Sequence, residues 1–149
     1  MKKQVTTLSE FQDVLFSLVS EIIDTTPSNQ SVVIALSGDL GVGKTTAVQY
    51  VAQKLGVDEQ VQSPTFVIKK TYLLQHGRFT QLMHTDAYRL ENQSVEPLRF
   101  QDDFDNPQTI SFVEWPEIIK DVLPIHTHWI MIYHGEQEGE RIIEYKKTA

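Results

Sequence analysis

The stretch Val32-Val-Ile-Ala-Leu-Ser-Gly-Asp-Leu-Gly-Val-Gly-Lys-Thr-Thr46 decides the fold. Its first part, 32–36, is a continuous apolar and partly β-branched run, which is typical of a central strand buried on both faces of a sheet. Residues 37–44 form a glycine-rich turn. An apolar stripe at helical spacing then predicts a helix over 45–55, with Gly56 just past its end. This order of strand, glycine-rich turn and helix is typical of a phosphate-binding unit.

The turn matches the pattern G-x-x-x-x-G-K-[ST] over Gly38–Thr45. Glycines let the chain curl so that backbone N–H groups approach a polyphosphate, and the start of the next helix adds its own free N–H groups. We expect Lys44 to reach the β- and γ-phosphates, Thr45 to ligate Mg²⁺ and Thr46 to contact the α-phosphate. ATP and Mg²⁺ are therefore the predicted ligands. Further ATP contacts are expected from the other loop residues, which are Asp39, Leu40, Gly41, Val42 and Gly43.

Two acidic residues each follow a strand-like run, so each is expected at the carboxyl edge of the sheet where ligands bind. Asp86 ends the run 82–86 and Glu114 ends the run 110–114. A phosphate-binding loop needs a neighbouring acid that holds Mg²⁺ directly or through water. Glu114 is the predicted metal-side residue, and Asp86 either supports the metal or orients the attacking water. With Lys44 they form the predicted catalytic set, although the sequence leaves open which acid touches the metal.

The rest of the chain completes an alternation of strands and helices, which predicts an α/β fold. We expect a P-loop NTPase-like three-layer sandwich with a mixed, mainly parallel central sheet, formed by residues 1–149 as a single P-loop ATPase domain. Ser9, with Gln12 three residues later, predicts the cap of a first helix. The remaining predicted segments are strands at 4–7, 66–74, 78–85, 109–113, 129–133 and 141–145, and short helices near 97–100 and 117–122.

Composition narrows the class of protein. The formal net charge is −7, with 20 acidic and 13 basic residues, whereas a protein that binds nucleic acid on its own usually carries a basic face. There is no cysteine, which excludes a disulfide framework and a thiolate metal site. No apolar run approaches the ~20 residues of a membrane-spanning helix. These features predict a cytoplasmic protein that does not enter the membrane.

Four sequence blocks occur in order and together resemble the TsaE family, formerly called YjeE. They span nearly the whole chain: Gly38–Thr46, Ser63-Pro-Thr-Phe66, His84-Thr-Asp-Ala-Tyr-Arg-Leu90 and Val113-Glu-Trp-Pro-Glu117. The resemblance implies an ATPase that works with the proteins TsaD and TsaB to make N6-threonylcarbamoyladenosine. That modified base lies next to the anticodon of tRNAs that read codons beginning with adenine. The resemblance further implies hydrolysis that depends on the partners, and contact with tRNA only through the complex.

The resemblance also assigns roles to individual residues. Lys44 and Thr45 become the phosphate and magnesium residues, Asp86 the acid of the third block and Glu114 the Walker B-like acid. Around them, the resemblance assigns a switch loop to Ser63, Pro64 and Thr65, and places Trp115 beside Glu114. On the adenine side it matches Thr7, Phe11 and Arg141 only loosely. The third block departs from the family at Thr85 and Ala87, where Phe and Leu are more frequent.

Other functions fit parts of the sequence. A small-molecule kinase on a P-loop scaffold would usually need an arginine-rich lid, which the sequence does not show. A GTPase would need an Asn-Lys-x-Asp run to select guanine, and none exists. A nucleotide-sensing module that binds partners without hydrolysis remains an alternative. His126 and His128 alternate as a metal pair would, but no third ligand accompanies them in the sequence.

Overall fold

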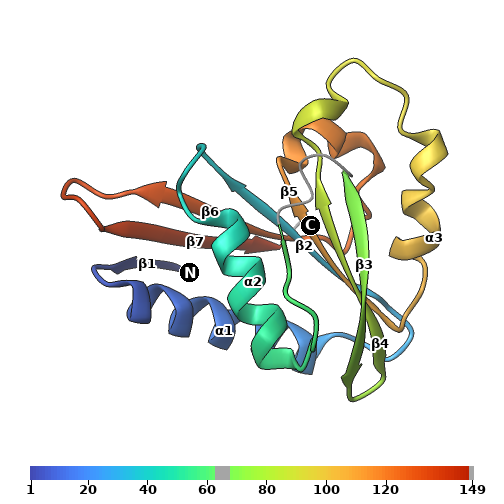
Figure 1. Cartoon of the computed structure of the whole chain (residues 1–149), viewed down its shortest axis with the longest axis horizontal. Helices are drawn as coiled ribbons and strands as arrows, with labels where there is room; N and C mark the ends of the chain where they lie inside the picture. The colour runs from blue at the N-terminus through green and yellow to red at the C-terminus, as the bar shows by residue number, and fades with distance from the viewer. Residues whose placement is uncertain (63–67, 148–149) are drawn as a thin grey trace.

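The computed structural model describes residues 1–62 and 68–147, in which seven strands form one sheet with helices on its two faces (Figure 1). The strand order is β1-β7-β6-β2-β5-β4-β3. In chain order the elements are β1 (Lys2–Val5), α1 (Leu8–Thr25), β2 (Val32–Gly38), α2 (Lys44–Leu55), β3 (Lys69–His76), β4 (Phe79–Asp86), η1 (Tyr88–Leu90), η2 (Glu96–Leu98), α3 (Phe100–Phe104), β5 (Thr109–Glu114), η3 (Pro116–Val122), β6 (His128–His134) and β7 (Arg141–Lys147).

The centre of the sheet is parallel and its edges are antiparallel. The adjacent strands β6, β2, β5 and β4 run parallel to one another, while β3 pairs antiparallel with β4, β7 with β6 and β1 with β7. All six residues of β5 and the first five of β2 are buried, as expected for strands that are covered on both faces. The predicted α/β fold with a mixed sheet is confirmed, and its parallel strands occupy the middle.

Two hydrophobic cores cover the two faces of the sheet and make the three layers. Neighbouring residues of β2 point to opposite cores, so that Ile34 and Leu36 pack under α1 and α2 while Val33 packs on the other side with α3 and η3. The helices α1 and α2 lie side by side on the first face (Figure 1). The apolar stripe of α1 consists of Phe11, Leu15, Leu18, Val19, Ile22 and Ile23.

The first helix begins earlier than the sequence predicted. Its cap is Thr7, whose hydroxyl accepts a hydrogen bond of 3.1 Å from the backbone N–H of Glu10. The prediction of Ser9 as the cap was wrong, because Thr7 with Glu10 and Ser9 with Gln12 both fit the capping pattern. The helix follows only two residues after the end of β1 at Val5, so it uses the earlier of the two.

The long polar segment between β4 and β5 holds more structure than the single short helix expected near 97–100. It contains η1, η2 and α3, with Arg99 in a left-handed conformation between the last two. The predicted helix at 117–122 is the 3-10 helix η3, which starts at Pro116, a residue that suits the first helical position. The hairpin predicted around Gly77 is confirmed for the described residues. Within residues 1–62 and 68–147, no helix combines the length and apolar character needed to cross a membrane.

His128, at the start of β6, makes stability sensitive to pH. Its Nδ1 lies 2.7 Å from the hydroxyl of Tyr145, and the two rings are stacked. Burial lowers the pKa of His128 to about 4, and the nearby Lys147 and His126 add to this effect. The folded protein therefore keeps His128 neutral at a pH where the unfolded chain protonates it.

We predict that the free energy of unfolding falls as the pH drops from about 6.5 to about 4, and that His128 accounts for about 2–3 kcal/mol of this loss. The sign follows because the unfolded state binds the additional proton in that window. Urea unfolding at pH 7 and pH 4.5 measures the difference. His128→Asn should show a smaller loss than the wild type, whereas the control His134→Asn, at an exposed position of the same strand, should not. Equal losses in the wild type and His128→Asn would exclude this assignment.

Candidate functional site

The glycine-rich loop joins the end of β2 to the start of α2 at the carboxyl edge of the parallel strands. Gly43 caps α2 in a left-handed conformation and offers no side-chain hydrogen bond to it. The first N–H groups of a helix have no partner within the helix, so α2 presents them with the positive end of its dipole. Local geometry thus builds an anion-binding end from Gly43 and the residues that follow it.

Close packing fixes the path of this loop. A Cβ atom at Gly38 would lie 2.6 Å from the carbonyl oxygen of Ile132 in β6 and 2.8 Å from Val42, so no larger residue fits there. Val42 is only 1% exposed and belongs to the core under α1 and α2. Its carbonyl accepts a hydrogen bond of 2.9 Å from Nε of Arg141 in β7. The ring of Phe11 lies 3.3 Å from the position of a Cβ at Gly43.

The family resemblance loosely matches Thr7, Phe11 and Arg141 to the adenine side of the nucleotide, and the structure shows where these three residues lie. Phe11 and Arg141 both pack against the loop itself. Thr7 is the cap of α1, and its hydroxyl is engaged with Glu10. An ATP contact by these three residues stays a prediction.

A cavity of about 250 Å³ lies in front of the loop and collects most of the predicted site residues. Asp86 and Glu114 enter it because they end adjacent parallel strands and are direct partners in the sheet register. The lining residues are Leu40, Gly41, Gly43, Lys44, Thr45, Thr46, Asp86, Glu114 and Trp115. Asp39 lies instead in a neighbouring cavity of about 530 Å³, together with Tyr88, Trp115 and Glu117.

Glu114 is the most enclosed acid of the site. The hydroxyl of Thr45 donates to its two carboxylate oxygens at 2.9 and 3.0 Å, and Nε2 of His84 lies 2.6 Å from its Oε2. Glu114 is 2% exposed and His84 is fully buried. A buried carboxylate needs such partners, because leaving water without them is costly. The sequence predicted His84 within the strand 78–85 but did not predict this contact, although the period of two puts His84 on the same face as Asp86.

Lys44 is turned back onto the protein. Its Nζ donates to the carbonyl of Gly38 and lies 3.7 Å from the centroid of the Trp115 ring. Burial lowers the pKa of the Lys44 ammonium, and the nearby carboxylates, first Glu114 and then Glu117, partly oppose that effect. The loop lysine is thus held by a carbonyl, an aromatic face and surrounding negative charge.

Asp86 sits at a turn that continues from β4. Its Oδ1 accepts a hydrogen bond of 3.0 Å from the backbone N–H of Tyr88, and the Tyr88 ring contacts Trp115 with centroids 5.1 Å apart. Trp115 itself has a positive φ of 55°. The backbone N–H of Asp86 donates to Ile68, the first described residue after position 67. The predicted switch residues Ser63, Pro64 and Thr65 lie outside the described residues.

The donor set suits a small, hard cation that also binds phosphate. Thr45 and Glu114 bring oxygen donors together at the helix end. In the described part of the chain, no group of three His, Cys, Asp or Glu residues is placed to hold a metal on its own. Mg²⁺ usually takes one or two protein oxygens and completes its shell with phosphate and water. The residues present therefore fit Mg²⁺ bound together with a nucleotide.

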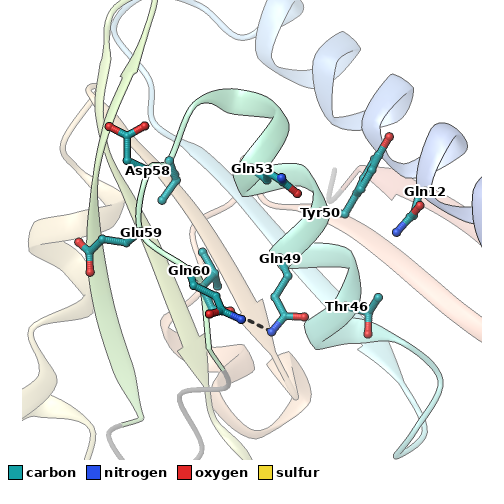
Figure 2. A pocket seen from close by; sticks show the side chains of 10 residues that line it. Gln12, Thr46, Gln49, Tyr50, Gln53, Asp58, Glu59 and Gln60 are labelled. Atoms are coloured by element: carbon teal, nitrogen blue, oxygen red, sulfur yellow. Dashed lines mark hydrogen bonds between the residues drawn. The ribbon is translucent and has the colours of Figure 1, made fainter.

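A second cavity, of about 490 Å³, lies along α2, and Thr46 lines both it and the first cavity (Figure 2). Four of its lining side chains are amides, which are Gln12 on α1, Gln49 and Gln53 on α2, and Gln60. Gln49 donates a hydrogen bond of 2.8 Å to the carbonyl of Val61. This second cavity therefore links the N-terminal end of α2 to the segment that precedes position 63.

Comparison with known proteins agrees with this architecture. The family model described as "Threonylcarbamoyl adenosine biosynthesis protein TsaE" matches residues 9–143. The chain belongs to the TsaE family. Of the predicted site residues, only Thr7 lies outside the segment that the TsaE model matches.

Curated relatives named "tRNA threonylcarbamoyladenosine biosynthesis protein TsaE" are similar to this chain. The protein from Bacillus subtilis (strain 168) is 39% identical over 109 residues, which are 72% of this chain and 66% of the relative. The protein from Synechocystis sp. is 42% identical over 88 residues, 57% of this chain and 54% of the relative. The chain thus spans about half to two thirds of the length of these relatives. The crystal structure of Bacillus subtilis YdiB superposes with a TM-score of 0.68 at 25% identity, covering 100% of this chain and 86% of that one.

The tight approach of Gly38 to β6 gives a stability prediction. Gly38→Ala should lower the free energy of unfolding by about 2–4 kcal/mol, because the new Cβ meets a backbone carbonyl and the φ of 156° is unfavourable for alanine. The control Gly41→Ala also places alanine at a positive φ, 78°, but its Cβ meets nothing within 4 Å, so about 1 kcal/mol is expected. Urea unfolding measures both. Equal losses would show that the contact with Ile132 does not constrain the loop.

Proposed function

We propose that this protein binds ATP with Mg²⁺ and hydrolyses it as the ATPase component of the machinery that makes N6-threonylcarbamoyladenosine in tRNA. One observation carries the proposal: Lys44, Thr45, Asp86 and Glu114 converge on a single cavity at the N-terminal end of α2. Membership of the TsaE family supports the tRNA-modification context. Because all seven described strands join one sheet, we assign the activity to a single P-loop domain.

In this proposal the triphosphate lies along the loop and meets the free N–H groups at the start of α2. Lys44 leaves the carbonyl of Gly38 and turns its ammonium to the β- and γ-phosphates, which are stronger acceptors because they are charged. The hydroxyl oxygen of Thr45 would hold the metal, and the hydrogen of this hydroxyl is donated to Glu114. Bound Mg²⁺ would neutralise charge on the β- and γ-phosphate oxygens.

The chemical step is in-line attack of water on the γ-phosphorus. The oxygen of water forms the new P–O bond, the bond to the bridging oxygen breaks, and the water proton passes to a carboxylate or to the phosphate. Asp86 is assigned to orient this water, because it ends the strand next to Glu114 and lines the same cavity as Lys44 and Thr45. The loop amides and Lys44 stabilise the charge that develops on the phosphate oxygens.

The proposed partners are TsaD and TsaB, and tRNA contacts the protein only through that complex. The net charge of −7 supports this arrangement, because a polyanion such as tRNA is repelled by an acidic surface. An acidic protein is instead suited to docking on basic regions of a protein partner.

Replacing the loop lysine tests nucleotide binding. Lys44→Ala should weaken Mg–ATP binding roughly 10- to 100-fold, because a charge-assisted contact with the phosphates is lost, and should reduce hydrolysis below detection. Isothermal titration calorimetry and phosphate release measure the two effects. Lys54→Ala, in the last turn of the same helix, is the matched control and should behave as wild type. Normal turnover by Lys44→Ala, with an unchanged melting temperature, would contradict the assignment.

The partners separate an ATPase from a nucleotide sensor. Phosphate release by the wild-type protein should rise when TsaD and TsaB are added, if partner contact completes the catalytic arrangement. Lys44→Ala with the same partners is the control for contaminating activity. ATP binding without phosphate release, alone and with both partners, would favour the non-hydrolysing sensing module instead.

A further inference from the structure

His84 contacts Glu114 but takes no part in the chemical step proposed above. His84 lies on β4, two residues before Asp86, and both residues point to the same face as Glu114 on the adjacent strand β5. The imidazole is fully buried, and its Nε2 lies 2.6 Å from Oε2 of Glu114. Its Nδ1 has no hydrogen-bond partner among the described residues. Among the described residues, the ring therefore makes its polar contact through Nε2 alone, with Glu114.

The hydrogen-bonding partners assign the donor when Glu114 is a carboxylate. Its Oε2 can then only accept, so Nε2 of His84 carries the donated hydrogen. One oxygen of Glu114 is then held by a rigid ring on a central strand. The hydroxyl of Thr45, on α2, lies 2.9 Å from Oε1 and 3.0 Å from Oε2 of the same carboxylate. The carboxylate is therefore clamped between the sheet and the helix that carries the phosphate site.

The ammonium group of Lys44 offers an alternative partner for the Glu114 carboxylate. Lys44 carries the positive charge that lines the same cavity, and Glu114 is the carboxylate that acts most strongly on its pKa. A glutamate with free rotation would swing towards this ammonium, since opposite charges attract strongly in a partly buried site. The ion pairs between described residues do not include one between Lys44 and Glu114. The carboxylate lies instead against Thr45 and His84.

We propose that His84 is a positioning residue that fixes Glu114 for the metal-side role and keeps it from neutralising Lys44. The inference rests on the proposed binding of Mg²⁺ with ATP and adds to it the residue that orients the metal-side acid. Groups that orient a metal ligand typically contribute 10- to 100-fold in metal affinity. The alternative is that His84 only fills space in the core. In that case an apolar residue of similar volume would replace it without changing the affinity for the metal.

Three substitutions separate these roles. His84→Leu fills the space without a donor. His84→Gln places an amide nitrogen at the same ε position as Nε2 of the imidazole, whereas His84→Asn carries its amide nitrogen one bond nearer the backbone. Melting temperatures establish that each variant is folded. The Gln and Asn variants keep the test decisive if His84→Leu fails to fold.

The first readout is the tightening of ADP binding by Mg²⁺, measured by calorimetry with Mg²⁺ and with EDTA. His84→Leu and His84→Asn should lose roughly 10-fold or more of this tightening while their affinity in EDTA stays within about two-fold of wild type. His84→Gln should recover most of it. Wild-type tightening in folded His84→Leu, or equal recovery by Asn and Gln, would overturn the proposal. Absence of ADP binding by the wild-type protein in both conditions would instead overturn the proposed function on which it rests.

The second readout needs no nucleotide. A crystal structure of His84→Leu, or of His84→Asn if the Leu variant does not fold, should show the Glu114 carboxylate moved to within ion-pair distance of Nζ of Lys44. His84→Gln should keep Glu114 on Thr45. A Glu114 side chain that remains on Thr45 in the variant without a donor would show that His84 does not hold it there.

Discussion

The close approach of Gly38 to β6 is the constraint on which the site depends. There is no room for a side chain between the backbone at position 38 and the carbonyl of Ile132. Because Gly38 has no Cβ, β2 can pass this close to β6 as it turns into the loop. Val42 then anchors the loop in the core, and Arg141 holds its carbonyl from β7. The antiparallel strand β7 therefore also supports the loop, through the contact between Arg141 and Val42. A rigid loop presents its amides without a cost of ordering when an anion arrives.

The register of the sheet sets the charge of the site. Because Asp86 and Glu114 are paired positions at the ends of β4 and β5, both acids arrive at the loop together. Among the described residues that line this cavity and its neighbour, Lys44 is the cationic one, while the acids are Asp39, Asp86, Glu91, Glu114 and Glu117. A polyphosphate that enters such a site meets net repulsion unless further positive charge comes with it. Charge balance therefore supports the proposed pairing of the nucleotide with a divalent cation.

Features encoded locally could be predicted from the sequence. The apolar run at 32–36 predicted a buried strand, the segment 109–113 predicted another strand, and the glycine pattern placed the loop between β2 and α2. Features set by tertiary contacts could not be predicted. The contact of His84 with Glu114 depends on the register between two strands far apart in sequence. The choice of Thr7 over Ser9 as a cap depends on where β1 ends. The helices between β4 and β5 have only three to five residues each, which is too short for an apolar pattern to repeat. The sequence pattern therefore could not predict them.

The described residues on both sides of positions 63–67 are held by the elements that carry the predicted site residues Thr45 and Asp86. Before that segment, Val61 accepts a hydrogen bond from Gln49 of α2, the helix whose first turn carries Thr45 (Figure 2). After it, Ile68 accepts a hydrogen bond from the backbone of Asp86. A shift of α2 or of the Asp86 turn when phosphate binds would therefore act directly on both ends. The described residues that flank this segment are thus tied to Thr45 and Asp86, and the switch role that the family resemblance assigns to Ser63, Pro64 and Thr65 stays a prediction.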